Sequence, residues 1–262
     1  MNVYLIKSYF WYLLKSRFRK GYGIHSPFVF DLVRELVYCK HSFYAYEKIA
    51  LFRRKLMRSK QVLTMSDYGA GSSTFKTKKR NVSELVSKTS VTKKYGELLF
   101  RLVNHFNPDT VLELGTSIGM STAYLALSNT KRKVYSIEAC DEMAQKAKEG
   151  LQNLGCNNVN QIIGQFCDVL PDLLGEIKTL DFVFFDGHHQ KQATLDYFHM
   201  CLLKVSNDSV FVFDDIHWSK GMDEAWNIIC ENPAVTVSMD LFQFGIVFFR
   251  KECQKQHFIV KY

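Results

Sequence analysis

Residues 111–121 have the sequence Val111-Leu112-Glu113-Leu114-Gly115-Thr116-Ser117-Ile118-Gly119-Met120-Ser121, an apolar strand that runs into a glycine turn and then a helix. Gly115 permits a tight turn, Gly119 lets the following helix approach closely, and Ser121 offers a hydroxyl in its first turn. The third glycine of the dinucleotide fingerprint is missing, which argues against NAD or FAD. By itself the pattern indicates only a ligand-binding turn after a strand.

The same alternation of strand and helix continues toward the C-terminus. Short apolar runs separated by helix-length segments occupy residues 110–114, 133–137, 159–163, 181–185 and 209–213. Two further runs, 235–239 and 244–249, are too close together for a helix between them and predict an antiparallel hairpin on the sheet edge. The sequence therefore predicts an α/β fold, a Rossmann-like doubly wound, mostly parallel seven-stranded sheet with a C-terminal hairpin.

Composition narrows the class of protein. The chain has 262 residues, 47% of them hydrophobic and 23% charged, which excludes a disordered or low-complexity protein. No apolar run approaches the ~18 to 20 residues of a membrane span. The start lacks a small-residue cleavage site, so a signal peptide is not expected. Seven cysteines without a C-x-x-C pair predict neither a disulfide framework nor a zinc knuckle, and the expected compartment is the reducing cytoplasm.

Charge divides the chain into a basic front and a mildly acidic back. Residues 1–100 carry a net charge of +14 and residues 101–262 a net charge of −6. Helical spacing dominates the front, so we expect residues 1–90 to be a basic, mainly helical lid or appendage and residues 91–262 to be the catalytic domain. A basic face can attract nucleic acid, anionic lipid or an acidic substrate, and it can also be a solvated face.

Two parts of the front leave alternatives open. The helices of residues 1–60 combine aromatic and basic residues, which suits a lid, a dimer element or a membrane-surface helix. Bulky aromatics mixed with Gly21, Gly23 and Pro27 favour the lid. The glycine tract at residues 67–72 is expected to form either an anion-binding nest or a loop over the cofactor mouth.

Polar residues follow the second and third expected strands, where ligands bind in open α/β sheets. Glu138 ends the second strand, a position from which a carboxylate accepts both hydroxyls of a ribose, although acids are also common where a helix begins. After the third strand, Phe166 is placed to contact an adenine ring and Asp168 its amino group, or else Asp168 caps the next helix.

The fourth and fifth strands are followed by acids and histidines. The three acids are Asp186, Asp214 and Asp215, and the three histidines are His188, His189 and His217. Three carboxylates at neighbouring strand ends would repel one another, so they predict a magnesium or calcium site. The histidines beside them are suited to act as general bases near neutral pH, and one of them can be structural.

These motifs resemble a known family. From about residue 95 to residue 250 the chain resembles the class I S-adenosylmethionine (SAM)-dependent methyltransferases, and within them the metal-dependent O-methyltransferases that include catechol and macrolide-sugar enzymes. The resemblance implies that SAM is bound by Glu113, Gly115, Thr116, Ser117, Gly119, Ser121, Glu138, Phe166, Asp168 and Asp186.

The resemblance also implies a metal and a base. Asp186, Asp214 and Asp215 match the metal ligands, with Mg²⁺ the expected ion, although the catechol enzymes have asparagine in place of Asp215. His189 stands where the catechol enzymes place a lysine base. The sugar-modifying branch is closer, since Asp-Gly-x-His and Asp-Asp-x-His often follow the same two strands there.

The expected function is O-methylation of a small hydroxylated acceptor, either a vicinal diol, a catechol or a sugar. The expected catalytic residues are His189, His217 and Asp186. One alternative is an RNA or DNA methyltransferase that uses the basic front, but Asp186-Gly187-His188-His189 replaces the Asn/Asp-Pro-Pro-Tyr of amino-methylating enzymes. The other alternative is a cofactor-binding module without turnover. The small acceptor is the expected partner, nucleic acid is not favoured, and a homodimer stays open.

Overall fold

The computed structural model describes residues 3–16, 18, 20–64 and 79–262. The chain divides into two compact units, a central unit, Ser42–Lys178, and a split unit made of Met1–His41 and Thr179–Tyr262. The glycine tract at residues 67–72 lies outside the described residues. Whether residues 1–90 serve as an appendage or lid of one catalytic domain stays a prediction.

The central unit carries the glycine turn. Its parallel strands lie in the order β3 (Thr110–Leu114), β4 (Lys133–Glu138) and β5 (Val159–Ile163). Each is followed by a helix, α6 (Met120–Ser128), α7 (Asp141–Leu154) and α8 (Phe166–Glu176). Because all three strands are parallel, their carboxyl ends and the polar residues after them lie at one edge.

The remaining elements of the central unit precede these strands. They are α3 (Tyr44–Met57), the antiparallel pair β1 (Val62–Thr64) and β2 (Lys79–Asn81), α4 (Val82–Lys88) and α5 (Lys93–Phe106). Helix α5 buries Leu98, Leu99, Leu102 and Val103, the three- and four-residue spacing expected of a helix that packs on a core. Asn107 ends it in the left-handed conformation, with a φ of 48°, directly before Pro108.

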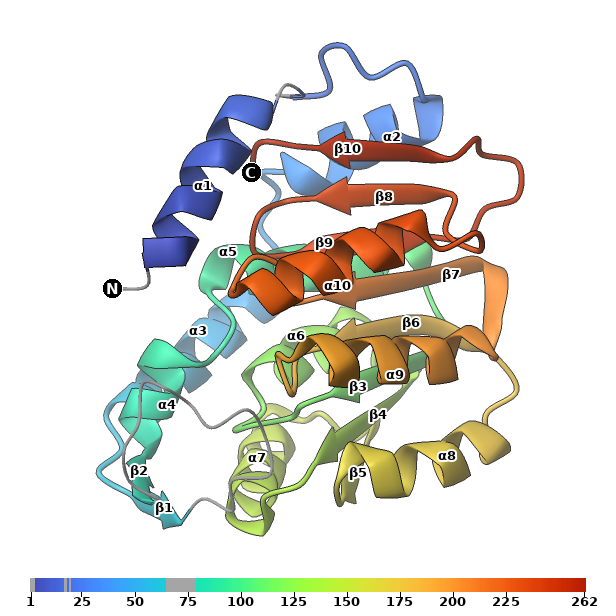
Figure 1. Cartoon of the computed structure of the whole chain (residues 1–262). Coiled ribbons are helices and arrows are strands. Elements are labelled where there is room, and N and C mark those ends of the chain that lie inside the picture. Colours follow the sequence, from blue (N-terminus) through green and yellow to red (C-terminus); the bar gives the residue numbers. More distant parts are fainter. Residues whose placement is uncertain (1–2, 17, 19, 65–78) are drawn as a thin grey trace. The chain divides into compact units, whose positions relative to one another are not determined.

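The split unit contains the other strands of the α/β fold, in the order β10-β8-β9-β7-β6. They are β6 (Leu180–Phe185), β7 (Val205–Phe213), β8 (Val237–Asp240), β9 (Gly245–Phe248) and β10 (Gln256–Ile259). Strands β6 and β7 are parallel, and β8 and β9 form the expected hairpin. Figure 1 shows helices α9 (Lys191–Leu202) and α10 (Lys220–Glu231) in front of these strands.

The N-terminal helices of the split unit are α1 (Val3–Lys15), α2 (Pro27–Leu32) and the π-helical turn η1 (Val33–Val37). Ser26 caps α2, since its hydroxyl oxygen accepts from the amide of Val29, and Pro27 occupies the first turn. The ring of Phe28 contacts that of Phe248 in β9 with centroids 5.1 Å apart, so α2 packs on the hairpin. Among the described helices, none has the length and apolar character needed to cross a membrane.

The expected α/β fold and its mostly parallel strands are confirmed. All five expected parallel strands are present, two of them with unchanged bounds. The two units together contribute eight strands to the α/β fold rather than seven, because β10 adds a parallel partner to β8. The hairpin is therefore not the edge of its sheet. Strand β10 is short and mostly exposed, and it lacks the apolar run by which a buried strand is recognised in sequence.

Candidate active site

The glycine turn of the central unit is held in a fixed shape. Gly115 and Gly119 have φ angles of 110° and 82°, which side-chain-bearing residues rarely adopt. A Cβ on Gly119 would lie 3.3 Å from Ala147 and Leu151 of α7, so glycine here also allows α6 to pack closely on α7. Both expected roles of these glycines, a tight turn and a close helix approach, agree with the structure.

Glu138 joins this turn to the end of β4. One carboxylate oxygen accepts from the amide of Ser117 at 2.7 Å, and the other accepts from the amide of Cys140 at 2.9 Å. Burial raises the pKa of Glu138, while these two amide donors act in the opposite direction. A carboxylate has about four acceptor positions, so acceptor capacity remains for ribose hydroxyls.

Glu113 is fully buried in β3 beneath the turn. Its Oε2 accepts from the hydroxyls of Thr122 and Ser136, each at 2.5 Å, while its Oε1 has no hydrogen-bond partner. Burial raises the pKa of Glu113 to about 7, although the hydroxyls of Ser121, Ser136 and Thr122 lower it in part. The structure thus places a carboxyl group that ionises near neutral pH under the expected cofactor cradle.

The remaining expected cofactor residues of the central unit are distributed around this turn. Thr116 is buried and its hydroxyl contacts that of Ser136 at 2.5 Å, and Ser121 is buried in the first turn of α6. Ser117 has a positive φ of 48°. Phe166 is buried at the first position of α8, whereas Asp168 is exposed in its first turn, where an acid also stabilises the helix.

The expected metal ligands all follow strands β6 and β7 of the split unit. The carboxyl groups of Asp186 and Asp214 are hydrogen-bonded to each other, and an oxygen of Asp214 accepts from the amide of Asp215 at 2.8 Å. Burial, and then the negative charge of Asp215, raise the pKa of Asp214 well above its usual value. Two carboxyl groups in contact need a proton or a cation between them.

These residues fit a metal ion in part. Their hard oxygen donors suit Mg²⁺ or Ca²⁺. Within the part of the chain that the structure describes, however, no group of three or more His, Cys, Asp or Glu side chains is arranged to hold a metal ion. Asp215 has a φ of 54°; burial raises the pKa of its carboxyl group, and the nearby His189 acts in the opposite direction. The metal therefore stays a prediction.

The three histidines have different surroundings. The Nε2 of His189 lies 3.7 Å from a carboxylate oxygen of Asp186. The ring of His188 stacks on Tyr197, and its Nδ1 is 2.9 Å from the Tyr197 hydroxyl. Of the three histidines, His189 is the one whose described contacts are with the aspartates expected to bind the metal. This position suits a base beside the acceptor.

His217 lies between two carboxylates. Its Nδ1 contacts Asp223 of α10, and its Nε2 is 2.8 Å from Asp240 of β8. Burial alone would lower its pKa, but the hydrogen bonds to Asp223 and Asp240 outweigh burial and raise the pKa to about 9. At neutral pH this imidazole is protonated and donates from both nitrogens, so the geometry favours a structural cation over a base.

Sequence reasoning missed the partners of these residues. Asp223 and Tyr197 lie six and nine residues after the histidines that they contact, and Asp240 lies 23 residues after His217. No motif in the sequence marks them as partners of these histidines. The sequence does contain a sign of the contact between Glu113 and Ser136, because both are polar residues within apolar strands. They occupy directly paired positions of β3 and β4.

The geometry of the glycine turn and Glu138 agrees with the families that this chain resembles. Residues 112–216 match the model of a methyltransferase domain family. This stretch is similar to methyltransferase domains. It begins within β3, includes the cradle residues Glu113 to Ser121 and Glu138, and ends just after Asp214 and Asp215.

Curated relatives of the methyltransferase domain are O-methyltransferases. The chain is 45% identical over 64 residues to protein-L-isoaspartate O-methyltransferase 1 of Polaromonas sp., a match that covers 24% of this chain and 26% of that protein. It is 29% identical over 129 residues to a catechol O-methyltransferase of Mycobacterium tuberculosis, which covers 48% of this chain and 57% of that protein. The chain thus spans only about a quarter to a little over half of these relatives.

Solved structures share the fold over more of the chain. TomG, a Streptomyces achromogenes O-methyltransferase involved in tomaymycin synthesis and crystallised with SAM, is 19% identical with a TM-score of 0.58, covering 80% of this chain and 91% of TomG. A Bacillus cereus O-methyltransferase in complex with S-adenosylhomocysteine (SAH) is 18% identical with a TM-score of 0.55, covering 82% of this chain and 94% of that one. At these identities the likeness shows the fold.

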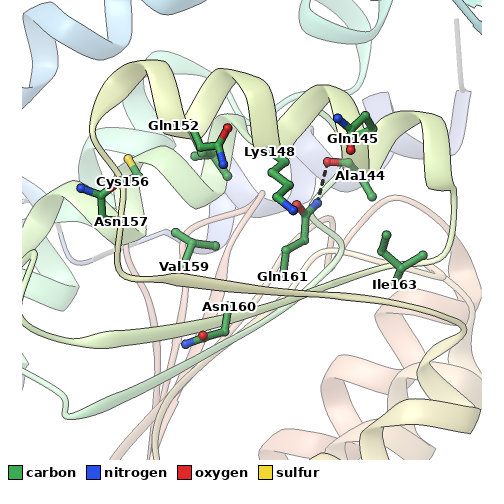
Figure 2. Close-up of a pocket in the computed structure, with 11 residues that line it drawn as sticks. Ala144, Gln145, Lys148, Gln152, Cys156, Asn157, Val159, Asn160, Gln161 and Ile163 are labelled. Atoms are coloured by element: carbon green, nitrogen blue, oxygen red, sulfur yellow. Dashed lines mark hydrogen bonds between the residues drawn. The ribbon is translucent and has the colours of Figure 1, made fainter.

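A hollow of the central unit is lined by none of the cradle residues. It has a volume of about 440 Å³ and is bounded by α7, β5 and the loop between them. Figure 2 shows Gln145, Lys148 and Gln152 on the helix and Gln161 reaching from the strand, its amide 2.9 Å from the carbonyl of Ala144. None of the expected cofactor residues lines this hollow, so we do not assign the cofactor to it.

Proposed function

We propose that this protein is a SAM-dependent O-methyltransferase that acts on a small hydroxylated acceptor, either a vicinal diol, a catechol or a sugar. The carrying observation is the glycine turn of residues 115–119 joined to Glu138 through the amide of Ser117. The methyltransferase domain match and the O-methyltransferase relatives support the same chemistry.

The residues of the central unit fit SAM. Glu138 offers a carboxylate to the ribose hydroxyls, and Phe166 and Asp168 are proposed to contact the adenine. The cofactor carries an ammonium group, and the buried carboxyl group of Glu113 lies beneath the turn, with its Oε1 outside the hydrogen bonds to Thr122 and Ser136. We assign the methionine end of SAM to the glycine turn for this reason. When bound, SAM supplies the electrophilic methyl group.

The acceptor oxygen must lose a proton as it attacks the methyl group. We propose that His189 takes this proton, because its described contact with Asp186 stabilises the imidazolium that forms. The new bond joins the acceptor oxygen to the methyl carbon, the bond from carbon to sulfur breaks, and SAH leaves. His217, already protonated, is proposed to position Asp223 and Asp240 rather than to act as a base.

We further propose that Asp186, Asp214 and Asp215 would hold a divalent cation, which would supply positive charge to the acceptor oxygen when bound. The contact between the carboxyl groups of Asp186 and Asp214 supports this assignment, since a cation would replace the proton they share.

A turnover assay tests the function and the metal separately. We expect SAH to form from SAM when catechols or sugars with neighbouring hydroxyls are supplied with Mg²⁺, and we expect excess chelator to abolish its formation. Turnover that survives the chelator would contradict the metal role but retain the methyltransferase. Tight SAM binding without SAH formation on any hydroxylated acceptor, RNA or DNA would instead support a binding module.

The raised pKa of Glu113 predicts that the stability of the protein depends on pH. Its pKa is raised from the ordinary value of about 4.5 to about 7, so the folded state binds more protons than the unfolded state between these values. Stability from this group is therefore fully present below pH 4.5 and is lost as pH rises through 7, by about 3 kcal/mol. Denaturant unfolding at several pH values should show this loss.

Glu113→Gln is the matched variant, because glutamine is similar in shape and does not ionise. The difference in the free energy of unfolding between the two proteins should shift by about 3 kcal/mol in favour of the variant between pH 4.5 and pH 8. Parallel pH profiles for the two proteins would show that Glu113 does not titrate in this range.

A further inference from the structure

Helix α1 is attached to the split unit by one side. The hydroxyl of Tyr12 donates to the carbonyl of Val260 at 2.6 Å, and that of Tyr4 donates to the carboxylate of Asp223. Tyr12 is the buried residue of this helix. These contacts fix which side of α1 faces inward, and Figure 1 shows the helix at the margin of the split unit.

The other side of α1 is apolar and exposed. Val3, Ile6, Phe10 and Leu14 follow one another at three- and four-residue spacing and so share one face. Val3, Phe10 and Leu14 are 64%, 61% and 59% exposed, and Trp11 beside them is 60% exposed. Contiguous apolar surface of this kind marks an interaction site. The lid hypothesis needs this side buried, so its exposure favours the membrane-surface alternative.

The charge around this face is positive. Residues 1–30 contain five basic residues and no Asp or Glu, and the five are Lys7, Lys15, Arg17, Arg19 and Lys20. Lys7 and Lys15 are exposed. The acids that act on α1 are Asp223 and Glu224 beside Tyr4, and Asp240 beside Tyr12. All three act on tyrosines of the attached side, and among the described residues no ion pair engages Lys7 or Lys15. The exposed face therefore combines aromatic and aliphatic side chains with positive charge.

We propose that the outer face of α1 docks on the surface of an anionic lipid membrane. Apolar side chains of this face enter the boundary between headgroups and acyl chains, and Lys7 and Lys15 contact the anionic headgroups. Trp11 suits this depth, because tryptophan is enriched at membrane interfaces. With 13 residues α1 is roughly 20 Å long, shorter than the ~30 Å hydrocarbon core, so it lies along the surface.

A second copy of the chain is the competing occupant of this face. A symmetric contact through α1 would bring Lys7 and Lys15 of each copy close together. Like charges held close in this way oppose association. An anionic lipid surface offers an apolar interior to the apolar side chains of this face and negative charge to its lysines.

Vesicle sedimentation of the full chain tests the proposal. We expect the chain to sediment with vesicles that contain phosphatidylglycerol and to remain in the supernatant with pure phosphatidylcholine vesicles. Salt at about 1 M, where the Debye length is ~3 Å, should weaken the binding strongly. Trp11 emission should shift to shorter wavelength on binding, and the variant Trp11→Phe should sediment but lose the shift.

A matched pair of variants locates the contact. The double variant Phe10→Asp, Leu14→Asp should bind anionic vesicles roughly a hundredfold more weakly, because two large apolar side chains no longer enter the lipid. Leu203→Asp alters a residue that is 83% exposed just after α9 and should bind as the unaltered chain does. Both should retain the far-UV dichroism and SAM affinity of the unaltered chain.

Three outcomes would overturn the proposal. They are equal sedimentation with both kinds of vesicle, unchanged binding by a folded double variant, and a lipid-free dimer that the double variant converts to a monomer. The last outcome would assign the face to a second copy. If the double variant fails to fold, the salt dependence and the Trp11 signal of the unaltered chain still decide the matter.

Discussion

Replacing Glu138 with alanine is expected to weaken SAM binding by roughly 10²- to 10⁴-fold. The change removes a carboxylate proposed to accept two ribose hydroxyls, and each charge-assisted hydrogen bond contributes about 1.5 to 3 kcal/mol. It also leaves the amides of Ser117 and Cys140 without their acceptor, so the turn loses a contact that holds its shape. Titration calorimetry with SAM and SAH measures the effect.

Glu138→Gln distinguishes the two causes. Glutamine keeps one acceptor oxygen for a backbone amide but has no charge to offer the ribose. We expect an intermediate loss of affinity with stability close to that of the unaltered protein, whereas alanine should lower both. SAM affinity that alanine leaves unchanged would refute the ribose assignment.

The sequence was sufficient for the parts of this protein that depend on local pattern. Buried parallel strands are mostly apolar runs, which is why β3 was predicted with its observed bounds. The bounds of β5 were also predicted, although this strand is only partly covered and contains Asn160 and Gln161. Gly115 and Gly119 were recognisable because the turn needs positive φ angles. Strand β10 was missed because its Gln256 and His257 are polar and exposed, and only its pairing with β8 makes it a strand.

The roles of the histidines depend on contacts that no local pattern contains. His189 and His217 both follow a strand next to aspartates, and in sequence either could be the base. The structure distinguishes their roles, because His217 contacts Asp223 of a helix and Asp240 of a later strand. Hydrogen bonds to these two carboxylates raise the pKa of His217 to about 9. The pairing of distant segments decides such questions, and the sequence does not specify it directly.

Replacing His189 with glutamine is expected to lower kcat by about 10²- to 10⁴-fold, the usual contribution of a general base. Glutamine retains hydrogen-bonding capacity near Asp186 but cannot take the proton of the acceptor. SAM affinity should be unchanged, because none of the described contacts of His189 is with a cradle residue. Single-turnover formation of SAH, measured across pH, checks the prediction.

His217→Gln is the matched comparison, because it makes the same substitution in the other candidate base. This variant should lower the stability of the split unit, since Asp223 and Asp240 would lose the cation between them. Its single-turnover rate should depend on pH as that of the unaltered protein does. If His217→Gln, and not His189→Gln, lost the acidic limb of the rate profile, in which the base becomes protonated, the assignment would be reversed. A general base leaves its own pKa in the rate profile, whereas a structural imidazolium changes the unfolding transition, so the two measurements together identify which histidine accepts the proton.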